Sequence, residues 1–361
     1  MVRVCPCAAR EPLRGRAGHS VARRCTVGEQ LSLDLRAAVV GEGAAVARAV
    51  PAEQPRPWWD PDRAMLDEHP PYRDPTKDER RALGAVAGRI SASAVRVAEL
   101  LVASWPEPIE WPFARLLAIH AFYAELAGAA GMRVVPAYLG ALPSTAEAAI
   151  REATGWSRGE LGAEHLGAVQ ETLMGYGLAG GSVVATTGRR KGGIHFTPYD
   201  LALKVTLRTL EPLLRLVPPE HTLDLRICDP AVGGGVFLLA VVRVLAPRVL
   251  RAGRAQSLDE AKRLVALHCC YGVDRAVAAV MTTKLALTLE CRAAHMPGDW
   301  LDGNVKHGDA LVGLSLDQLA RFGWRPDGRG SELIRPLVDR AMAEGAAARQ
   351  AQLKSLSSSA R

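Results

Sequence analysis

The chain has 361 residues, 48% of them hydrophobic and 23% charged, a composition typical of a globular protein with one large domain or two smaller ones. The formal net charge of +7 suits a polyanionic partner such as nucleic acid, although charge alone does not identify one. No apolar run reaches the roughly 18 residues of a membrane span, and the arginine-rich start lacks the apolar core of a secretory signal, so the sequence predicts a cytoplasmic protein with no membrane partner.

Three segments fall outside the regular patterns of the rest. Residues 1–55 mix Arg, Ala and Gly without a period, and we expect them to be disordered. Residues 56–77 contain several prolines and are predicted to be a connector. Residues 314–361 are predicted to form a polar helical tail. The seven cysteines are scattered and form no C-x-x-C pair, which disfavours a zinc site and predicts reduced thiols without a bound metal.

Helical spacing of apolar residues begins after the connector. The runs "DERRALGAVAGRISASAVRVAELLVASW" and "FARLLAIHAFYAELAGAAG" predict two helices. Ser-x-x-Glu patterns at Ser144/Glu147 and Ser157/Glu160 predict capping boxes at the starts of two more. A glycine-rich basic loop, "AGGSVVATTGRRKGG", follows them. The sequence therefore predicts a helical domain over residues 78–180.

Helices and strands alternate beyond that loop. A predicted helix opens with Thr197 as its N-cap and Pro198 at its first position. Strands "LRIC", "HCCYGVD" and "NVKHGDALVG" then alternate with helices expected at 235–249 and 276–291. This β-α-β-α-β order is typical of an α/β fold with a parallel, doubly wound, Rossmann-like sheet, which we expect over residues 192–313.

The stretch "RICDPAVGGGVFL" places three glycines directly after a predicted strand. Gly233, Gly234 and Gly235 allow a sharp turn that brings backbone N–H groups against a ligand. The Gly-Lys-Ser/Thr of a nucleoside-triphosphate loop does not follow, and bulky apolar residues stand where a dinucleotide fingerprint needs its third small residue. Both of those ligand classes are therefore disfavoured.

Each of the three predicted strands ends in an acidic residue. Asp229 could accept from a cationic or amino-bearing group, and S-adenosylmethionine carries both a sulfonium and an ammonium. Asp274 could accept from ribose hydroxyls and Asp309 from an adenine amino group, while Phe237 could pack along the cofactor. The alternative is that the three carboxylates only cap the helices that follow them. Their joint occurrence beside a glycine turn favours the cofactor.

The chain contains four further patterns in one order: "KGGIHFTPYDLALKV", "ICDPAVGGGVFL", "YGVDRAVAAVMTTKLALTLE" and "NVKHGDALVGLSLDQLARFGW". They resemble motifs X, I, II and III of bacterial N6-adenine DNA methyltransferases of the gamma motif order, in particular the large type II restriction–modification-like enzymes. The segment "HLGAVQETLMGYGL" also resembles the helix that those enzymes carry ahead of motif X. The resemblance covers about residues 160–326. It implies an S-adenosylmethionine-dependent DNA adenine-N6 methyltransferase of a restriction–modification or phage-defence system.

The resemblance implies roles for matching positions. Thr197 and Pro198 would contact the carboxylate end of the cofactor's methionine, Asp274 would hold the ribose, and Asp309 the adenine amino group. The first strand and its turn would line the methionine moiety with Asp229, Pro230, Ala231, Gly233 and Gly235. The chain departs from the family pattern at Val232, where Cys or Met is usual, at Gly234, where Ser is usual, and at Arg275-Ala276.

The catalytic motif of the family does not occur in this sequence. Methyl transfer to N6 needs an Asn carbonyl and a backbone carbonyl to accept the amine hydrogens, and an aromatic side chain to stack the flipped base. Family members supply these from Asn-Pro-Pro-Tyr/Phe after a fourth strand; no Asn-Pro-Pro is present here, and in "EHPPY" His69 has no amide carbonyl. We therefore assign no catalytic residue and expect a truncated or split chain, with "LRICD" as an open edge strand. Its partners would be DNA and a complementary chain carrying the missing motif.

Two other functions stay open at this point. The chain could be a different S-adenosylmethionine-dependent methyltransferase that acts on RNA, protein or a small molecule. It could also be a non-catalytic remnant that assembles through its helical region. The basic "GRRKGG" at residues 188–193 could contact nucleic-acid phosphate or form a solvated loop.

Overall fold

A computed structural model describes residues 3–4, 77–155, 161–186, 197–312 and 335–360. The predictions for residues 1–55 and 56–77 lie outside the described residues, apart from residues 3–4 and 77. The same holds for "EHPPY", for "GRRKGG" and for the capping box at Ser157/Glu160.

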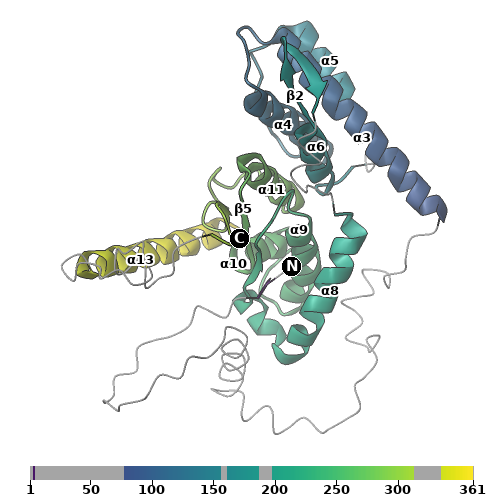
Figure 1. Cartoon of the computed structure of the whole chain (residues 1–361). Helices are drawn as coiled ribbons and strands as arrows, with labels where there is room; N and C mark the ends of the chain where they lie inside the picture. The colour runs from purple at the N-terminus through teal and green to yellow at the C-terminus, as the bar shows by residue number, and fades with distance from the viewer. Residues whose placement is uncertain (1–2, 5–76, 156–160, 187–196, 313–334, 361) are drawn as a thin grey trace, which may run out of the picture. The chain divides into compact units, whose positions relative to one another are not determined.

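Four helices form the first part of the described chain: α3 (Lys77–Ser104), α4 (Trp111–Ala129), α5 (Ser144–Thr154) and α6 (His165–Met174). The two helices predicted from apolar spacing are confirmed as α3 and α4. Helix α3 packs against the other three (Figure 1). The apolar faces that meet there bury Ile90, Leu101, Phe122, Ile150 and Leu173. Burial of each such side chain contributes about 1.5–3 kcal/mol, so this packing rather than capping holds the helices together.

The predicted helix starts differ from the observed ones. Pro143 is the N-cap of α5 and Ser144 is its first residue, so the capping box predicted at Ser144 is wrong. The buried Glu147 instead accepts a hydrogen bond from the backbone N–H of Gly140, at 3.1 Å. Helix α6 begins only at His165. At the start of α5, the contact of Glu147 with the preceding loop takes the place of the predicted cap.

A β-hairpin follows α6 where the sequence predicted only a loop. Strands β2 (Tyr176–Ala179) and β3 (Ser182–Ala185) pair antiparallel. Gly180 and Gly181 join them with φ angles of +56° and +75°, which a two-residue turn of this hand requires. The Gly-Gly pair between two short apolar runs is the signal that the prediction missed.

The sheet is mixed and small, in a chain that is otherwise mostly helical. Strands β4 (Ile227–Asp229), β5 (Cys270–Asp274) and β6 (Val305–His307) run parallel in that order, as the β-α-β-α-β pattern predicted. β1 (Arg3–Val4) pairs antiparallel with β4 on the side away from β5. The expectation that β4 is an open edge strand is therefore wrong, because β1 occupies that edge.

Helices cover this sheet on the scheme that the sequence predicted, with two additions. α8 (Tyr199–Leu216) packs against α9 (Val236–Arg251), whose residues are mostly buried, and α11 (Val277–Glu290) joins β5 to β6. The short helix η2 (Pro219–Asp224) and α10 (Leu258–Cys269) were not predicted. α10 has its own Ser-x-x-Glu start: the Ser257 side chain accepts from the N–H of Glu260, and Glu260 accepts from the N–H of Gln256.

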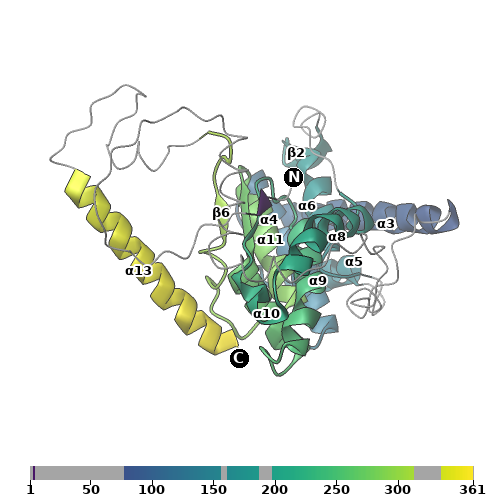
Figure 2. The ribbon, with the colours of Figure 1, turned by 90° about the horizontal axis from the view of Figure 1, so that it is seen from below.

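The helical part and the sheet part share an interface, because α4 and α6 both pack against α11. The described residues accordingly belong to one compact unit. The last described helix, α13 (Arg335–Ala360), packs on α10 through its C-terminal end, as Figure 2 shows. Within the part of the chain that the structure describes, no helix combines the length and apolarity that crossing a bilayer requires.

Candidate cofactor-binding site

The three acidic residues singled out from the sequence lie at one edge of the parallel sheet. Asp229 ends β4 opposite Gly272 of β5, and Asp274 ends β5 opposite His307 of β6. Asp309 follows the end of β6 by two residues. Parallel strands expose their carboxyl ends together, and ligands of such sheets bind in the crevice beyond that edge.

Asp229 is the most buried of the three, with 2% of its surface exposed. Its Oδ1 accepts a hydrogen bond from the N–H of Ala231 at 3.1 Å, whereas its buried Oδ2 has no partner among the described residues. Burial raises the pKa of this carboxyl; the hydrogen bond from Ala231 opposes the rise and the nearby Asp274 adds to it. A buried acceptor without a donor costs about 1–3 kcal/mol, so Oδ2 is suited to accept from a ligand.

The glycine turn is fixed in place by its neighbours. Gly233 has a φ of +52° and Gly235 a φ of +84°, backbone conformations that favour glycine. The N–H of Gly233 donates to Oδ2 of Asp274 at 2.9 Å, and its carbonyl accepts from Oγ1 of Thr283 at 2.9 Å. The turn is therefore held against the end of β5 and against α11 with its backbone in a defined conformation.

Asp274 and Asp309 both accept local backbone hydrogen bonds, but neither caps a described helix as the alternative from the sequence required, since the N-cap of α11 is Ala276 and has no side-chain cap. Oδ1 of Asp274 accepts from the N–H of Ala276 at 2.8 Å, at the entrance of α11. Oδ1 of Asp309 accepts from the N–H groups of Leu311 and Val312, and its Oδ2 lies 3.4 Å from Nε of Arg275. These two backbone hydrogen bonds, followed by the charge of Arg275, lower the pKa of Asp309. These local hydrogen bonds do not exclude binding, because each carboxylate oxygen has a second lone pair.

The start of α8 is placed differently from the prediction. Pro198 is the N-cap and Thr197 precedes it, so Thr197 is not the N-cap, and neither supplies a side-chain cap. α8 is joined to α9 through Tyr199, whose ring centroid lies 4.5 Å from the guanidinium carbon of Arg243. Phe237 is half-buried in the first turn of α9.

Of the remaining predicted residues, Pro230 is half-buried and Ala231 is exposed between β4 and the glycines. The structure thus joins Gly233 of the turn to Asp274, and Asp229 to Ala231 directly ahead of that turn. It records no hydrogen bond from Thr197 or Pro198 to that group within the described ranges.

Helix α6 contacts the glycine turn, a relationship that the sequence did not reveal. A Cβ atom on Gly234 would lie 2.3 Å from the Cα of Gly167, which is closer than any real contact. Any side chain larger than that of glycine therefore lacks room at position 234. The signal was the glycine in "HLGAV", but only the fold shows what it faces.

A half-buried charge cluster ties the start of α6 to the sheet helices. Nη2 of Arg243 lies 2.7 Å from Oε2 of Glu164 and 2.6 Å from Oε2 of Glu290, and Lys262 lies 2.8 Å from Oε1 of Glu290. Burial alone would raise the pKa of Glu164, but the charge and hydrogen bond of Arg243 lower it overall. Burial likewise opposes the charge of Arg243, yet Glu290 and Glu164 raise its pKa. These partners are far apart in sequence, so no local pattern could predict them.

The donors and acceptors at this edge suit a ligand that carries positive charge and hydroxyl or amino groups. They provide a buried carboxylate oxygen in need of a donor, a second carboxylate at the next strand end, and an exposed segment of backbone beside them. Comparison with protein-family models, with curated proteins and with solved structures finds no match to this chain.

Proposed function

We propose that this chain binds S-adenosylmethionine at the carboxyl edge of β4, β5 and β6, as the cofactor-binding part of a DNA adenine-N6 methyltransferase. The observation that carries the proposal is the unpartnered, buried Oδ2 of Asp229 beside a glycine turn that Asp274 holds in place. An ammonium donates a strong, charge-assisted hydrogen bond to such an oxygen, and the methionine end of S-adenosylmethionine carries one.

The fit of the cofactor follows from the chemistry of the residues present. Asp229 would accept from the ammonium, Asp274 from the ribose hydroxyls and Asp309 from the adenine amino group. Thr197 and Pro198 would lie toward the methionine carboxylate, and Phe237 would pack along the cofactor. When bound, S-adenosylmethionine supplies an electrophilic methyl group; the residues of this chain bind and orient it.

The methyl acceptor is proposed from the four motifs in the gamma order and from the basic charge of the chain. Since no Asn-Pro-Pro occurs in the 361 residues, the groups that accept hydrogens from adenine N6 and stack the base come from polypeptide outside this sequence. The partners are then DNA and a polypeptide with that motif, and the activity is cytoplasmic. The net charge of +7 supports an encounter with the DNA backbone.

A tritiated-methyl transfer assay tests the proposal. The full chain is incubated with labelled S-adenosylmethionine and with DNA, RNA or protein, with and without a second polypeptide that carries Asn-Pro-Pro-Tyr/Phe. We expect label on DNA adenine only when a polypeptide with Asn-Pro-Pro-Tyr/Phe is present, and a large loss with Asp229→Asn. Label on RNA or protein would instead favour a different methyltransferase, and cofactor binding without transfer to any acceptor would favour a remnant.

A further inference from the structure

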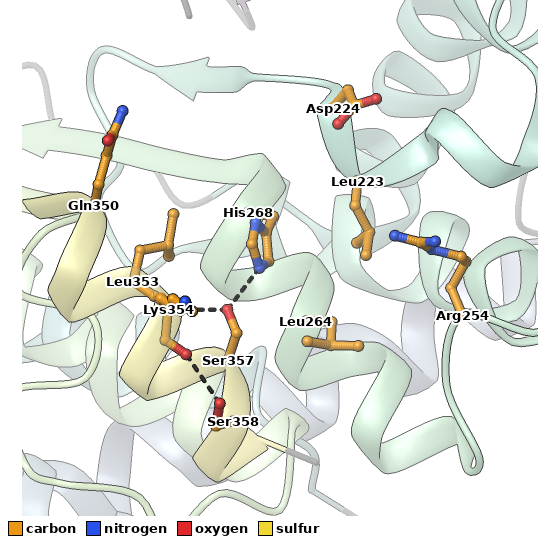
Figure 3. A pocket seen from close by; sticks show the side chains of 10 residues that line it. All are labelled: Leu223, Asp224, Arg254, Leu264, His268, Gln350, Leu353, Lys354, Ser357 and Ser358. Atoms are coloured by element: carbon orange, nitrogen blue, oxygen red, sulfur yellow. Dashed lines mark hydrogen bonds between the residues drawn. The ribbon is translucent and has the colours of Figure 1, made fainter.

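A hollow lies between η2, α10 and the C-terminal end of α13, near the amino ends of β4 and β5 (Figure 3). The serine hydroxyls in its wall are engaged within the chain. Ser357 donates to the carbonyl of Leu353 at 2.7 Å, and Ser358 donates to the carbonyl of Lys354 at 3.2 Å. Arg254 stands across the hollow from Lys354 (Figure 3). These groups therefore do not converge on one ligand, and we base no binding site on them.

The peptide groups on both sides of Gly233, at the carboxyl edge of the sheet, are fixed by side chains from two other elements. The N–H of Gly233 donates to Oδ2 of Asp274 at the end of β5, at 2.9 Å. Its carbonyl accepts from Oγ1 of Thr283 in α11, also at 2.9 Å, and no second donor to this carbonyl is recorded among the described residues. Thr283 has 0% of its surface exposed, so it can act on a ligand only through the turn.

Thr283 also fills the space beside the next left-handed glycine of the turn. A Cβ atom on Gly235, whose φ is +84°, would lie 3.0 Å from Cγ2 and 3.1 Å from Oγ1 of Thr283. The methyl group of this threonine therefore packs on the backbone at position 235, while its hydroxyl bonds to the backbone at position 233.

Three elements enclose the turn in this way. The end of β5 contacts it through Asp274, α11 contacts it through Thr283, and α6 contacts it through Gly167, which lies against Gly234. The helices α6 and α11 also pack against each other. Glycine has wide backbone freedom, so a turn of three glycines needs such outside contacts to keep one conformation. The bond from Thr283 is the contact that sets the direction of the Gly233 carbonyl.

We propose that Thr283 is a positioning residue of the cofactor site, whose hydroxyl fixes the Gly233 peptide in the conformation that receives S-adenosylmethionine. This inference rests on the proposed function. Without the hydroxyl, the carbonyl of Gly233 lacks its donor, and conformations in which that peptide turns toward water compete with the observed one. A site that is in its binding conformation only part of the time binds its ligand more weakly in proportion to that fraction.

Isothermal titration calorimetry with S-adenosylmethionine tests the proposal on the full chain and on two variants of this residue. Thr283→Val keeps the shape of the side chain and replaces the hydroxyl by a methyl group. We expect it to bind about tenfold more weakly, the loss that follows if the turn keeps its binding conformation about one-tenth of the time. Thr283→Ser keeps the hydroxyl and should bind within about threefold of wild type.

Thr282→Val is the matched control. Thr282 is the neighbouring residue in α11, it also has 0% of its surface exposed, and its hydroxyl also donates to a backbone carbonyl, that of Ala278 at 2.7 Å. This second bond stays within α11 and does not reach the turn, as is usual for a threonine inside a helix. The control should therefore bind S-adenosylmethionine as wild type does. Urea denaturation verifies that all three variants are folded.

Amide hydrogen exchange at Gly233, followed by NMR in the chain without cofactor, reports on the turn itself. It should be faster in Thr283→Val than in Thr282→Val, because the Gly233 peptide is then held on one side only. The inference is overturned if the two valine variants exchange alike, if they bind the cofactor alike, or if Thr283→Ser binds as weakly as Thr283→Val. If wild type itself does not bind S-adenosylmethionine, the proposed function fails, and this inference fails with it.

Discussion

The backbone of Gly167 in α6 meets the backbone of Gly234 in the turn after β4 so closely that a Cβ on Gly234 would fall 2.3 Å from the Gly167 Cα. Two glycines 67 positions apart in the chain thus allow a helix to pack on a strand-to-helix turn. The contact places α6 of the helical part directly against the glycine turn that follows β4.

Substitution of Gly234 by alanine should therefore strain this contact. Backbone on both sides leaves no flexible side chain to move, so we expect Gly234→Ala to lower the free energy of unfolding by about 1–3 kcal/mol. Urea denaturation followed by circular dichroism measures it. Gly88→Ala is the control, since a Cβ there has nothing within 4 Å; it should raise the stability of α3 by about 0.5–1 kcal/mol. Equal behaviour of the two variants would show that α6 does not pack on the turn.

The ionised carboxylate of Asp229, which we propose binds the ligand, should lower the stability of the free chain. Its pKa is raised on folding above the unfolded value of about 3.9, so the folded state binds its proton more tightly. The stability that this group contributes is present below pH ~4 and is lost as the pH rises through the raised folded-state pKa. Asp229→Asn cannot ionise, and we expect it to be more stable than wild type at pH 7 by on the order of 1 kcal/mol.

The check is a series of urea denaturations of both proteins between pH 4 and pH 8. The advantage of the Asp229→Asn variant should grow as the pH rises and shrink toward pH 4. If the Asp229→Asn variant is less stable than wild type at pH 7, Oδ2 of Asp229 already has a hydrogen-bond donor in the folded chain. It is then not available to accept one from a ligand.

The charge cluster around Arg243 should contribute far more to the free energy of unfolding than an exposed ion pair does. Arg243→Ala leaves Glu164 and Glu290 half-buried without their shared cation, and we expect a loss of about 3–5 kcal/mol. Arg215→Ala is the control: its partner Glu211 lies at 2.6 Å, but 50% and 40% of the two side chains are exposed. That loss should stay below about 1 kcal/mol. Thermal or urea unfolding of both variants distinguishes the cases, and similar losses would contradict the cluster's role.

Glu164 should make the stability that this cluster contributes depend on pH. Its pKa is lowered on folding, so its contribution is present above the unfolded value of about 4.3 and is lost as the pH falls through the folded-state pKa. Glu164→Gln should therefore be less stable than wild type at pH 7, and the difference should narrow at pH 3. Differential scanning calorimetry at both pH values measures it. If the stability difference between Glu164→Gln and wild type is the same at both pH values, the ionised form of Glu164 does not contribute to stability.

The features predicted correctly from the sequence were local ones. Helices α3 and α4 follow from apolar spacing, and the strand ends at Asp229 and Asp274 from short apolar runs that stop at an acid. The turn at Gly233 follows because its backbone conformation requires glycine. Each depends on residues that are neighbours in the chain.

The features that were missed depend on distant partners or on competing local signals. Neither the pairing of β1 with β4 nor the contact of Gly167 with Gly234 leaves a periodic trace in the sequence. The Ser144 pattern predicted a cap, but the N-cap position of α5 is Pro143 and no side chain caps it. The matching pattern at Ser257, which does cap α10, was not predicted. A capping signal is weak, and the packing around it decides whether it is used.

Binding of S-adenosylmethionine to the full chain, measured by isothermal titration calorimetry at pH 7, tests the central claim most directly. The account predicts one saturable site, with Asp229→Asn and Asp274→Asn each at least about tenfold weaker and the exposed Asp299→Asn unchanged. The account is contradicted if the chain does not bind S-adenosylmethionine at millimolar concentration, or if Asp229→Asn leaves the affinity unchanged.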